Sequence, residues 1–130
     1  MSEAFSPAAL MNEIASQRVP GEDSALIQKK AGDSIIEQGE EGTVMFFIES
    51  GKANIIVNGQ VFETVEPGGI IGEMALIDSE VRSADVVAAS DCNLVPISRQ
   101  RFVNLVQKKP MFSLYVMSVM NRRLRASVNR

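Results

Sequence analysis

Residues 68–86 contain the combination of glycines and charged side chains that is best suited to binding a ligand. The segment starts with Gly68 and Gly69 and runs through Gly72 and Glu73 to Arg82. Glycines let a backbone turn tightly and approach a ligand closely, and residues 72–77 have the composition of a single helical turn after a strand. Backbone amides at the start of such a turn bind anions, and an arginine nearby offers paired donors to the same anion.

Glu73 adds a second kind of recognition. A carboxylate cannot bind phosphate, but it accepts a hydrogen bond from a sugar hydroxyl. The combination with Arg82 indicates a ligand with a singly charged phosphate and a sugar, such as a cyclic phosphodiester. A triphosphate site would need a lysine and a magnesium ligand, and the sequence has no Walker pattern. Spacing alone leaves open a second interpretation, in which Glu73 and Arg82 form a surface ion pair near a turn.

The composition excludes several kinds of site. The 130 residues include no histidine, which excludes Ser-His-Asp and Cys-His pairs, histidine metal sites and histidine-ligated haem. Cys92 is the one cysteine, so no intrachain disulfide or CxxC motif exists. Its strand-like surroundings favour a buried, inert thiol in a reducing cytoplasm. We therefore expect a cytoplasmic protein that is not an enzyme and that holds no metal and no cofactor.

Two separated segments resemble the cyclic nucleotide-binding domain family. Residues 71–76 (Ile-Gly-Glu-Met-Ala-Leu) and 81–86 (Val-Arg-Ser-Ala-Asp-Val) are similar to the two halves of its phosphate-binding cassette, at the usual spacing. An upstream block, residues 31–51, is similar to a second family motif, and the similarity extends over about residues 26–125. Ile71 and Val81 stand where the family usually has Phe and Pro, and both lie outside the polar contacts.

The resemblance implies a role for each matching residue. Arg82 would bind the cyclic phosphate and Glu73 the ribose 2′-hydroxyl. The other expected ligand-binding residues are Gly72, Met74 and Ala75 through backbone groups, Ser83 through its hydroxyl and Ala84 through its amide.

The resemblance says less about the base. Residues 121–124 (Asn-Arg-Arg-Leu) are similar to the helix that covers the base in the catabolite activator branch, and a hydroxyl residue shortly after this run meets adenine there. Ser127 is the matching residue, and Val128 follows where that branch often has a second hydroxyl. A serine after the cassette arginine, here Ser83, favours guanine in some members. We expect cAMP as the ligand, with cGMP as the alternative.

These residues need a scaffold, and its middle part is typical of a β protein. Asn58-Gly59 lies between apolar runs and predicts a two-residue hairpin. Many short strands at even spacing favour a barrel. We predict a mainly β fold, an eight-stranded jelly-roll barrel, within a domain at 24–130. A short N-terminal helix at 4–18 and a linker make up residues 1–23. The strand-like runs are 25–28, 34–37, 44–49, 53–57, 60–65, 84–89 and 93–97.

Two helices are expected at the C-terminal end, at 99–107 and 110–127, separated by Lys108-Lys109-Pro110. The second helix has two apolar faces. One face is formed by Phe112, Val116, Val119 and Met120. The other, termed the α-seam here, steps by three and four residues through Leu114, Met117, Asn121, Leu124 and Val128. Our hypothesis is a homodimer through this helix, and the alternative is that both faces pack within one subunit.

Charge is unevenly distributed. Residues 1–98 carry 5 basic and 16 acidic side chains, whereas residues 99–130 carry 8 basic and no acidic ones. A basic tail can bind nucleic acid or an anionic membrane, but an overall charge of −3 makes nucleic acid a poor partner. We favour a basic helix lying against an acidic body. The apolar stretch 111–120 is too short to span a bilayer, and the N-terminus lacks a signal-peptide pattern.

We therefore predict a stand-alone cyclic nucleotide sensor, without a DNA-binding or catalytic module, that acts on an unknown downstream protein. Nucleotide binding would order the cassette turn and draw helix 110–127 over the pocket. One alternative is a module of the same fold that binds protein and no nucleotide. Another is a sensor of cyclic di-GMP, with extra arginines from Arg122, Arg123 and Arg125.

Overall fold

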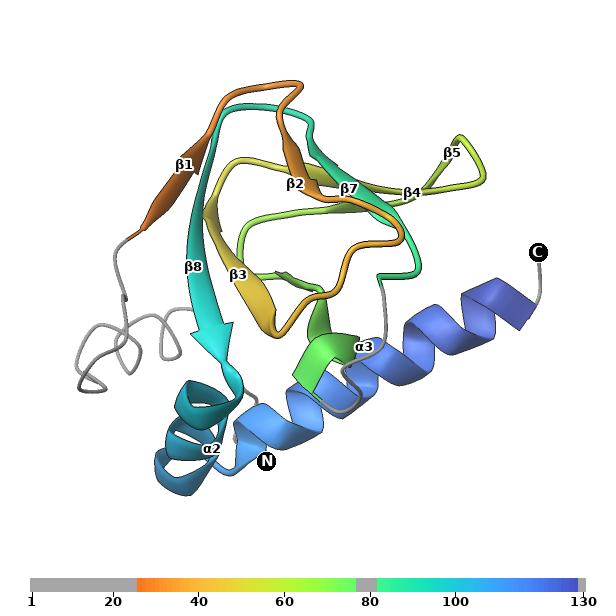
Figure 1. Cartoon of the computed structure of the whole chain (residues 1–130). Helices are drawn as coiled ribbons and strands as arrows, with labels where there is room; N and C mark the ends of the chain where they lie inside the picture. Colours follow the sequence, from red (N-terminus) through yellow and green to blue (C-terminus); the bar gives the residue numbers. More distant parts are fainter. Residues whose placement is uncertain (1–25, 77–81, 129–130) are drawn as a thin grey trace.

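The computed structural model describes residues 26–76 and 82–128, which form eight strands in two antiparallel four-stranded sheets, followed by two helices (Figure 1). The sheet orders are β1-β8-β3-β6 and β2-β7-β4-β5. The strands are β1 (Ile27–Lys29), β2 (Ser34–Ile36), β3 (Val44–Ser50), β4 (Ala53–Val57), β5 (Gln60–Val65), β6 (Ile70–Ile71), β7 (Asp85–Ala88) and β8 (Cys92–Ser98). The mainly β jelly-roll architecture expected from the sequence is confirmed.

Strands β3 and β8 are apolar on both faces because each face meets a different core. Leu94 of β8 lies in a cluster between the two sheets, with Ile55 and Val86 of the second sheet. Its neighbour Val95 faces the opposite way, into a cluster with α2 and α3. A strand covered on both faces has a continuous apolar run instead of a strict alternation.

The hairpin predicted at Asn58-Gly59 is confirmed. Asn58 and Gly59 have φ of 53° and 78°, and they join the antiparallel strands β4 and β5. Asparagine and glycine tolerate these left-handed values, which a two-residue turn between twisted strands requires.

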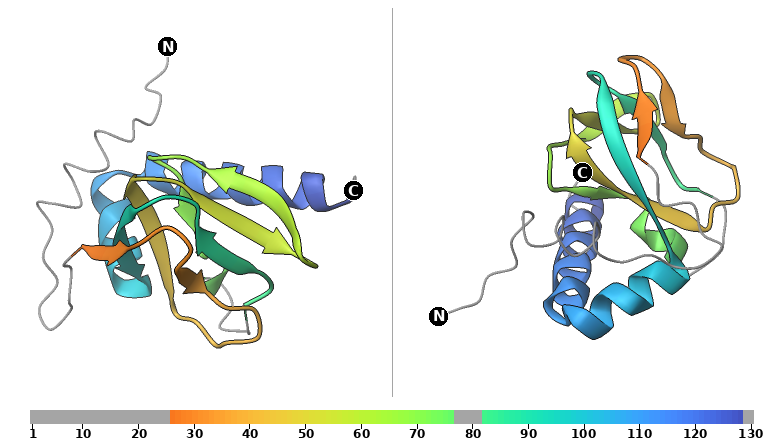
Figure 2. Two further views of the ribbon diagram at one scale, coloured as in Figure 1. Left: turned by 90° about the horizontal axis from the view of Figure 1, so that it is seen from above. Right: turned by 90° about the vertical axis from the view of Figure 1, so that its left-hand side faces the viewer.

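The C-terminal helices are α2 (Arg99–Lys108) and α3 (Met111–Val128). Ser98 caps α2, because its side-chain oxygen accepts a hydrogen bond of 3.1 Å from the Arg101 backbone amide. Figure 2 shows α3 running along the β domain, with α2 crossing near its start. Phe112, Val116 and Val119 of α3 are buried as expected, whereas the apolar side chains of the α-seam are exposed.

Several predicted boundaries need correction. The predicted strand at 25–28 is shifted, since β1 is Ile27–Lys29, and the predicted run 84–89 is trimmed to Asp85–Ala88. Strand β6 was not among the predicted ranges, because glycines on both sides leave only two apolar residues. The predicted N-terminal helix at 4–18 and the domain boundary at 23/24 lie outside the described residues.

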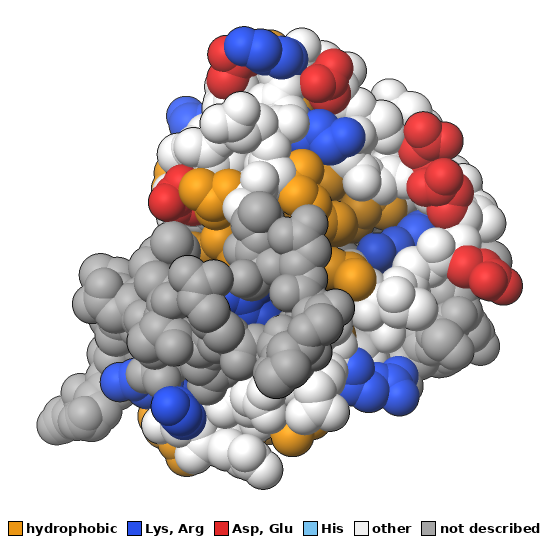
Figure 3. Space-filling view, turned by 60° about the vertical axis from the view of Figure 1, so that its left-hand side comes forward, with side chains coloured by type: hydrophobic (Ala, Val, Ile, Leu, Met, Phe, Trp, Pro, Cys, Tyr) orange, Lys and Arg blue, Asp and Glu red, His pale blue; other side chains and the backbone are white. Residues whose placement is uncertain are grey.

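The uneven charge of the sequence is visible on the surface. On the face in Figure 3, the acidic side chains lie over the upper part, together with some basic ones, whereas the charged side chains of the described lower part are basic. Further along the chain, Arg123 of α3 pairs with Glu63 of β5 at 2.8 Å. The basic helix therefore lies against acidic side chains of the β domain, as favoured above. Within the described residues, no helix is both long and apolar enough to span a membrane.

Candidate functional site

All eight residues selected from the sequence line one cavity of about 930 Å³, between the β domain and α3. Its walls also include side chains of β2, β4, β5 and β7. The predicted residues that the structure brings together there are Gly72, Glu73, Met74, Ala75, Arg82, Ser83, Ala84 and Ser127. Their individual roles toward a ligand stay predictions.

The turn predicted after residue 71 is a short 3₁₀ helix, η1 (Glu73–Leu76), which lies between the β domain and α3 (Figure 1). Gly72 connects it to β6 with φ of 75°, a value that glycine adopts without strain. The turn is closed by a hydrogen bond of 3.2 Å from the Ala75 amide to the Gly72 carbonyl. This geometry places Glu73, Met74 and Ala75 of η1 at the cavity wall.

Arg82 is held at both its backbone and its side chain. Its amide donates to the Glu40 carbonyl at 2.7 Å. In the guanidinium, Nη2 donates to the Val44 carbonyl at 2.7 Å and Nη1 to the Gly72 carbonyl at 3.2 Å. Partial burial lowers the pKa of Arg82, while the charges of Glu40 and Glu73 oppose that shift. A guanidinium held in this way beside a turn has the charge and the fixed position that binding an anion requires.

Gly42 makes room for this arginine. A Cβ atom added at Gly42 would overlap Nε, Cζ and Nη2 of Arg82. The loop between β2 and β3 therefore positions Arg82 through the Glu40 carbonyl, and the absence of a side chain at Gly42 leaves room for the guanidinium. The role of Gly42 could not be predicted, because nothing in the neighbouring sequence shows which side chain packs over it.

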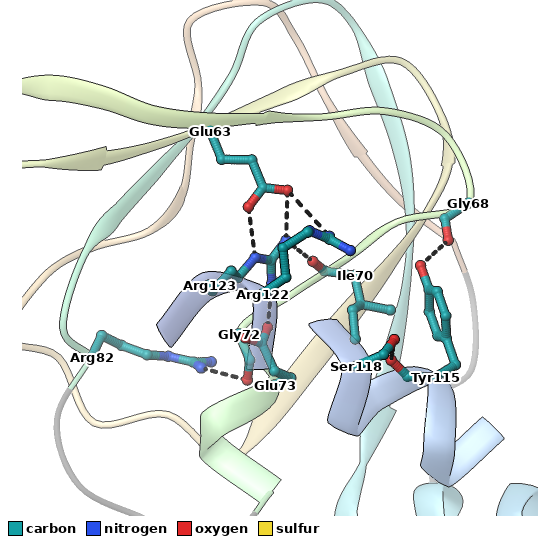
Figure 4. Close-up of polar contacts among 10 residues, drawn as sticks. All are labelled: Glu63, Gly68, Ile70, Gly72, Glu73, Arg82, Tyr115, Ser118, Arg122 and Arg123. Carbon is teal, nitrogen blue, oxygen red and sulfur yellow. Dashed lines mark hydrogen bonds and ion pairs between the residues drawn. The ribbon is translucent and has the colours of Figure 1, made fainter. Parts of the chain in front are cut away.

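Glu73 is 5% exposed, and its partner is Arg123 of α3. Arg123 Nη1 donates to Glu73 Oε1 at 2.7 Å, and Arg123 Nε donates to Glu63 Oε1 at 2.8 Å (Figure 4). Burial acts to lower the pKa of Arg123, but the hydrogen bonds and charges of the two carboxylates outweigh it, so the pKa is raised. Arg123 is therefore a fixed cation at the cavity, not a free basic side chain.

The cavity lining is largely apolar. Phe62 of β5 and Leu124 of α3 belong to it, together with Ser127, which is exposed. The amides Asn58 and Asn121 also line the cavity. These two asparagines were not predicted to line a site, because Asn58 lies in a turn motif and Asn121 lies in the α-seam.

The cavity therefore combines a fixed guanidinium, a buried carboxylate and an apolar region. This suits a ligand with an anionic group, a hydroxyl and a flat apolar ring. The described residues contain no cluster of three or more His, Cys, Asp or Glu side chains that could hold a metal ion.

Comparison with known proteins agrees with this chemistry. The model of the cyclic nucleotide-binding domain family matches residues 26–109, which include η1, Arg82 and the loop that holds it. The chain belongs to this family.

The chain is also similar to individual members of the cyclic nucleotide-binding domain family. The Cyclic AMP receptor protein of Thermus thermophilus is 31% identical over 99 residues, which are 72% of this chain and 46% of that protein. The Pycsar effector protein XpPycTIR of Xanthomonas perforans is 34% identical over 100 residues, 76% of this chain and 33% of that protein. The crystal structure of the Thermus thermophilus Catabolite Activator Protein has a TM-score of 0.66 at 28% identity, covering 78% of this chain and 51% of that one. The chain thus spans less than half of these two curated relatives.

Within this family site, Gly42→Ala is expected to weaken cyclic nucleotide binding about tenfold, the effect of disturbing one charged hydrogen bond. The added methyl group overlaps the Arg82 guanidinium and forces it away from the Val44 carbonyl. Calorimetric titration measures the change, and Thr43→Ala, at the exposed neighbouring residue, is the control. Unchanged affinity in Gly42→Ala would show that Arg82 binds from another position.

Proposed function

We propose that this chain binds a 3′,5′-cyclic mononucleotide, preferentially cAMP, and acts as a regulatory domain instead of an enzyme. The observation that carries the proposal is the placement of Arg82 and Glu73, from separate halves of the family cassette, on one cavity. One guanidinium neutralises the single charge of a cyclic phosphodiester. The name of the relative from Thermus thermophilus, a Cyclic AMP receptor protein, supports cAMP as the ligand.

In the proposed complex, Arg82 binds the phosphate together with the Ser83 hydroxyl and the Ala84 amide. Glu73 accepts a hydrogen bond from the ribose 2′-hydroxyl, while Gly72, Met74 and Ala75 provide backbone groups beside the sugar. The base lies toward α3, where Ser127 can bond to it. Because α3 carries both Ser127 and Arg123, ligand contacts with this helix couple binding to its position.

Cyclic di-GMP fits this cavity less well. Its second phosphate would need further cations, and Arg123 is already bonded to Glu63 and Glu73. Arg122 lies 3.7 Å from a Glu63 oxygen. Using either arginine for a second phosphate would break contacts with buried or half-buried carboxylates. Arg125, the third expected candidate, is exposed and forms no ion pair with the acidic side chains that the structure describes.

The proposal is tested by calorimetric titration of protein refolded from denaturant, so that no copurified nucleotide remains. The ligands are cAMP, cGMP, cCMP and cyclic di-GMP, which separate the base preference from the phosphate contact. We expect saturable binding with the lowest Kd for cAMP. A folded protein that binds none of the four would overturn the proposal and leave a protein-interaction module as the function.

We further propose that the α-seam packs against a second copy of the chain. Its apolar members are exposed, with Leu124 and Val128 at 64% and 74%, and their spacing is that of a two-helix coiled coil. Asn121 is the polar member, a residue type that specifies register at such a seam. The opposite face of α3 is buried on its own subunit. Met117, Asn121 and Leu124 of the seam also line the cavity, so Leu114 and Val128 are the seam residues outside the cavity lining that a neighbouring molecule would cover.

Leu114→Glu is expected to convert a dimer into a monomer, because it places a charge in the apolar contact. Sedimentation equilibrium measures the mass. Val103→Glu, at an exposed apolar residue of α2 outside the seam, is the matched control and is expected to stay dimeric. A wild-type protein that remains monomeric at high concentration would refute the dimer.

A further inference from the structure

Arg123 connects α3 to three other elements at the cavity, β5, β6 and η1. From α3 it reaches Glu63 on β5 with two bonds, Nε to Oε1 at 2.8 Å and Nη2 to Oε2 at 3.3 Å. It also reaches Glu73 on η1 at 2.7 Å and the Ile70 carbonyl at 2.9 Å. In Figure 4 the guanidinium of Arg123 lies between the two carboxylates. The side chains of Arg123 and Glu73 are 12% and 7% exposed, and that of Glu63 is 24% exposed.

We propose that Glu63 is a positioning residue for recognition of the sugar hydroxyl. Glu63 fixes the orientation of Arg123, and Arg123 binds Oε1 of Glu73, so that Oε2 of Glu73 is directed toward the 2′-hydroxyl of the ligand. Glu63 thereby makes the site selective for a ribonucleotide over its 2′-deoxy counterpart. This inference rests on the proposed function and deepens it.

The geometry explains why Glu63 matters to a carboxylate on another element. A guanidinium is planar and rigid, so two parallel bonds to one carboxylate fix its plane as well as its position. Without Glu63, Arg123 would keep its hydrogen bonds to Glu73 and to the Ile70 carbonyl. It would lose the two hydrogen bonds to Glu63 that fix the plane of its guanidinium. The guanidinium of Arg123 could then rotate, and the Glu73 carboxylate bonded to it would rotate as well. Oε2 of Glu73 would therefore no longer be held in one orientation toward the ligand.

Glu63 also holds α3 against β5, and that role must be separated from positioning. A helix that docks poorly would weaken binding of every cyclic nucleotide, since residues of α3 line the cavity. Disturbance of Glu73 alone affects just those ligands that present a 2′-hydroxyl. Ligands with and without this hydroxyl therefore distinguish the two roles.

The test is a calorimetric titration of Glu63→Gln with cAMP and with 2′-deoxy-cAMP. We expect the Kd for cAMP to rise about tenfold, as for the loss of one charged hydrogen bond, and the Kd for 2′-deoxy-cAMP to stay unchanged. The control is Glu66→Gln, which removes a carboxylate from an exposed ion pair with Lys52 and should alter neither Kd. Glu63→Asp, which keeps the charge but shortens the side chain, is the second variant if Glu63→Gln does not fold.

A double variant adds an independent criterion. If Glu63 acts through Glu73, then Glu63→Gln introduced into Glu73→Ala should not weaken cAMP binding further. Equal loss of affinity for both ligands, no loss for either, or additive losses in the double variant would each overturn the inference. Wild-type protein that binds neither nucleotide would instead refute the proposed function itself.

Discussion

Arg82→Ala is expected to reduce the affinity for cAMP by about 100-fold or more. The substitution removes the fixed guanidinium at the cavity and leaves the ligand phosphate without its cationic partner. Loss of one member of a half-buried, hydrogen-bonded charge pair costs about 2–5 kcal/mol, and about 2.7 kcal/mol corresponds to 100-fold. Calorimetric titration of the refolded variant measures this loss.

Two further variants distinguish a specific contact between Arg82 and the ligand phosphate from a general effect of positive charge on the protein. Arg82→Lys keeps the positive charge but loses the planar fork, so its affinity should fall between those of the wild type and Arg82→Ala. Lys30→Ala removes a highly exposed cation whose side chain is 84% accessible, and it should bind cAMP normally. Wild-type affinity in Arg82→Ala would place the phosphate elsewhere on the protein.

Phe112→Ala is expected to lower the free energy of unfolding by about 3–5 kcal/mol, the usual range for a buried phenylalanine. Phe112 is fully buried, and its ring lies 5.5 Å from that of Phe102 and 6.5 Å from that of Tyr115, between ring centres. It belongs to the cluster that joins α3 to β3 and to Leu76 of η1. Urea denaturation followed by circular dichroism measures the change.

Leu114→Ala is the matched control on the same helix. Leu114 is two residues further along and 52% exposed, so its truncation should change the free energy of unfolding of the monomer by less than about 1 kcal/mol. Similar losses in both variants would mean that α3 is not anchored through the face that contains Phe112. Because α3 carries Arg123 and Ser127, Phe112→Ala should also weaken cAMP binding.

The predictable part of this molecule is the part governed by local physics. The Asn58-Gly59 turn, the break before α3 and the two faces of α3 follow from backbone preferences and from apolar periodicity. The turn at Gly72 and the sequence spacing between Glu73 and Arg82 can both be identified within one short segment of the sequence. Gly72, Glu73 and Arg82 were expected to lie close together, and all three line one cavity.

The interactions that could not be predicted connect distant segments. Glu63 and Arg123 are 60 residues apart, and their contact depends on how α3 crosses β5. The basic tail and acidic body indicated attraction but not which residues pair. The role of Gly42 could not be predicted for the same reason, since it depends on the packing of Arg82 against this residue. Such contacts are set by tertiary packing, which periodicity does not describe.

The most direct measurement of the central hypothesis is an amide-resolved NMR titration of the ¹⁵N-labelled protein with cAMP. Saturable shifts are expected at the amides of Gly72, Ala75, Ser83 and Ala84, which line the cavity beside Arg82. Shifts along α3 would follow from contacts with Arg123 and Ser127. A well-dispersed spectrum that does not change at saturating cAMP, or that changes only far from this cavity, would contradict cyclic nucleotide binding at the cassette.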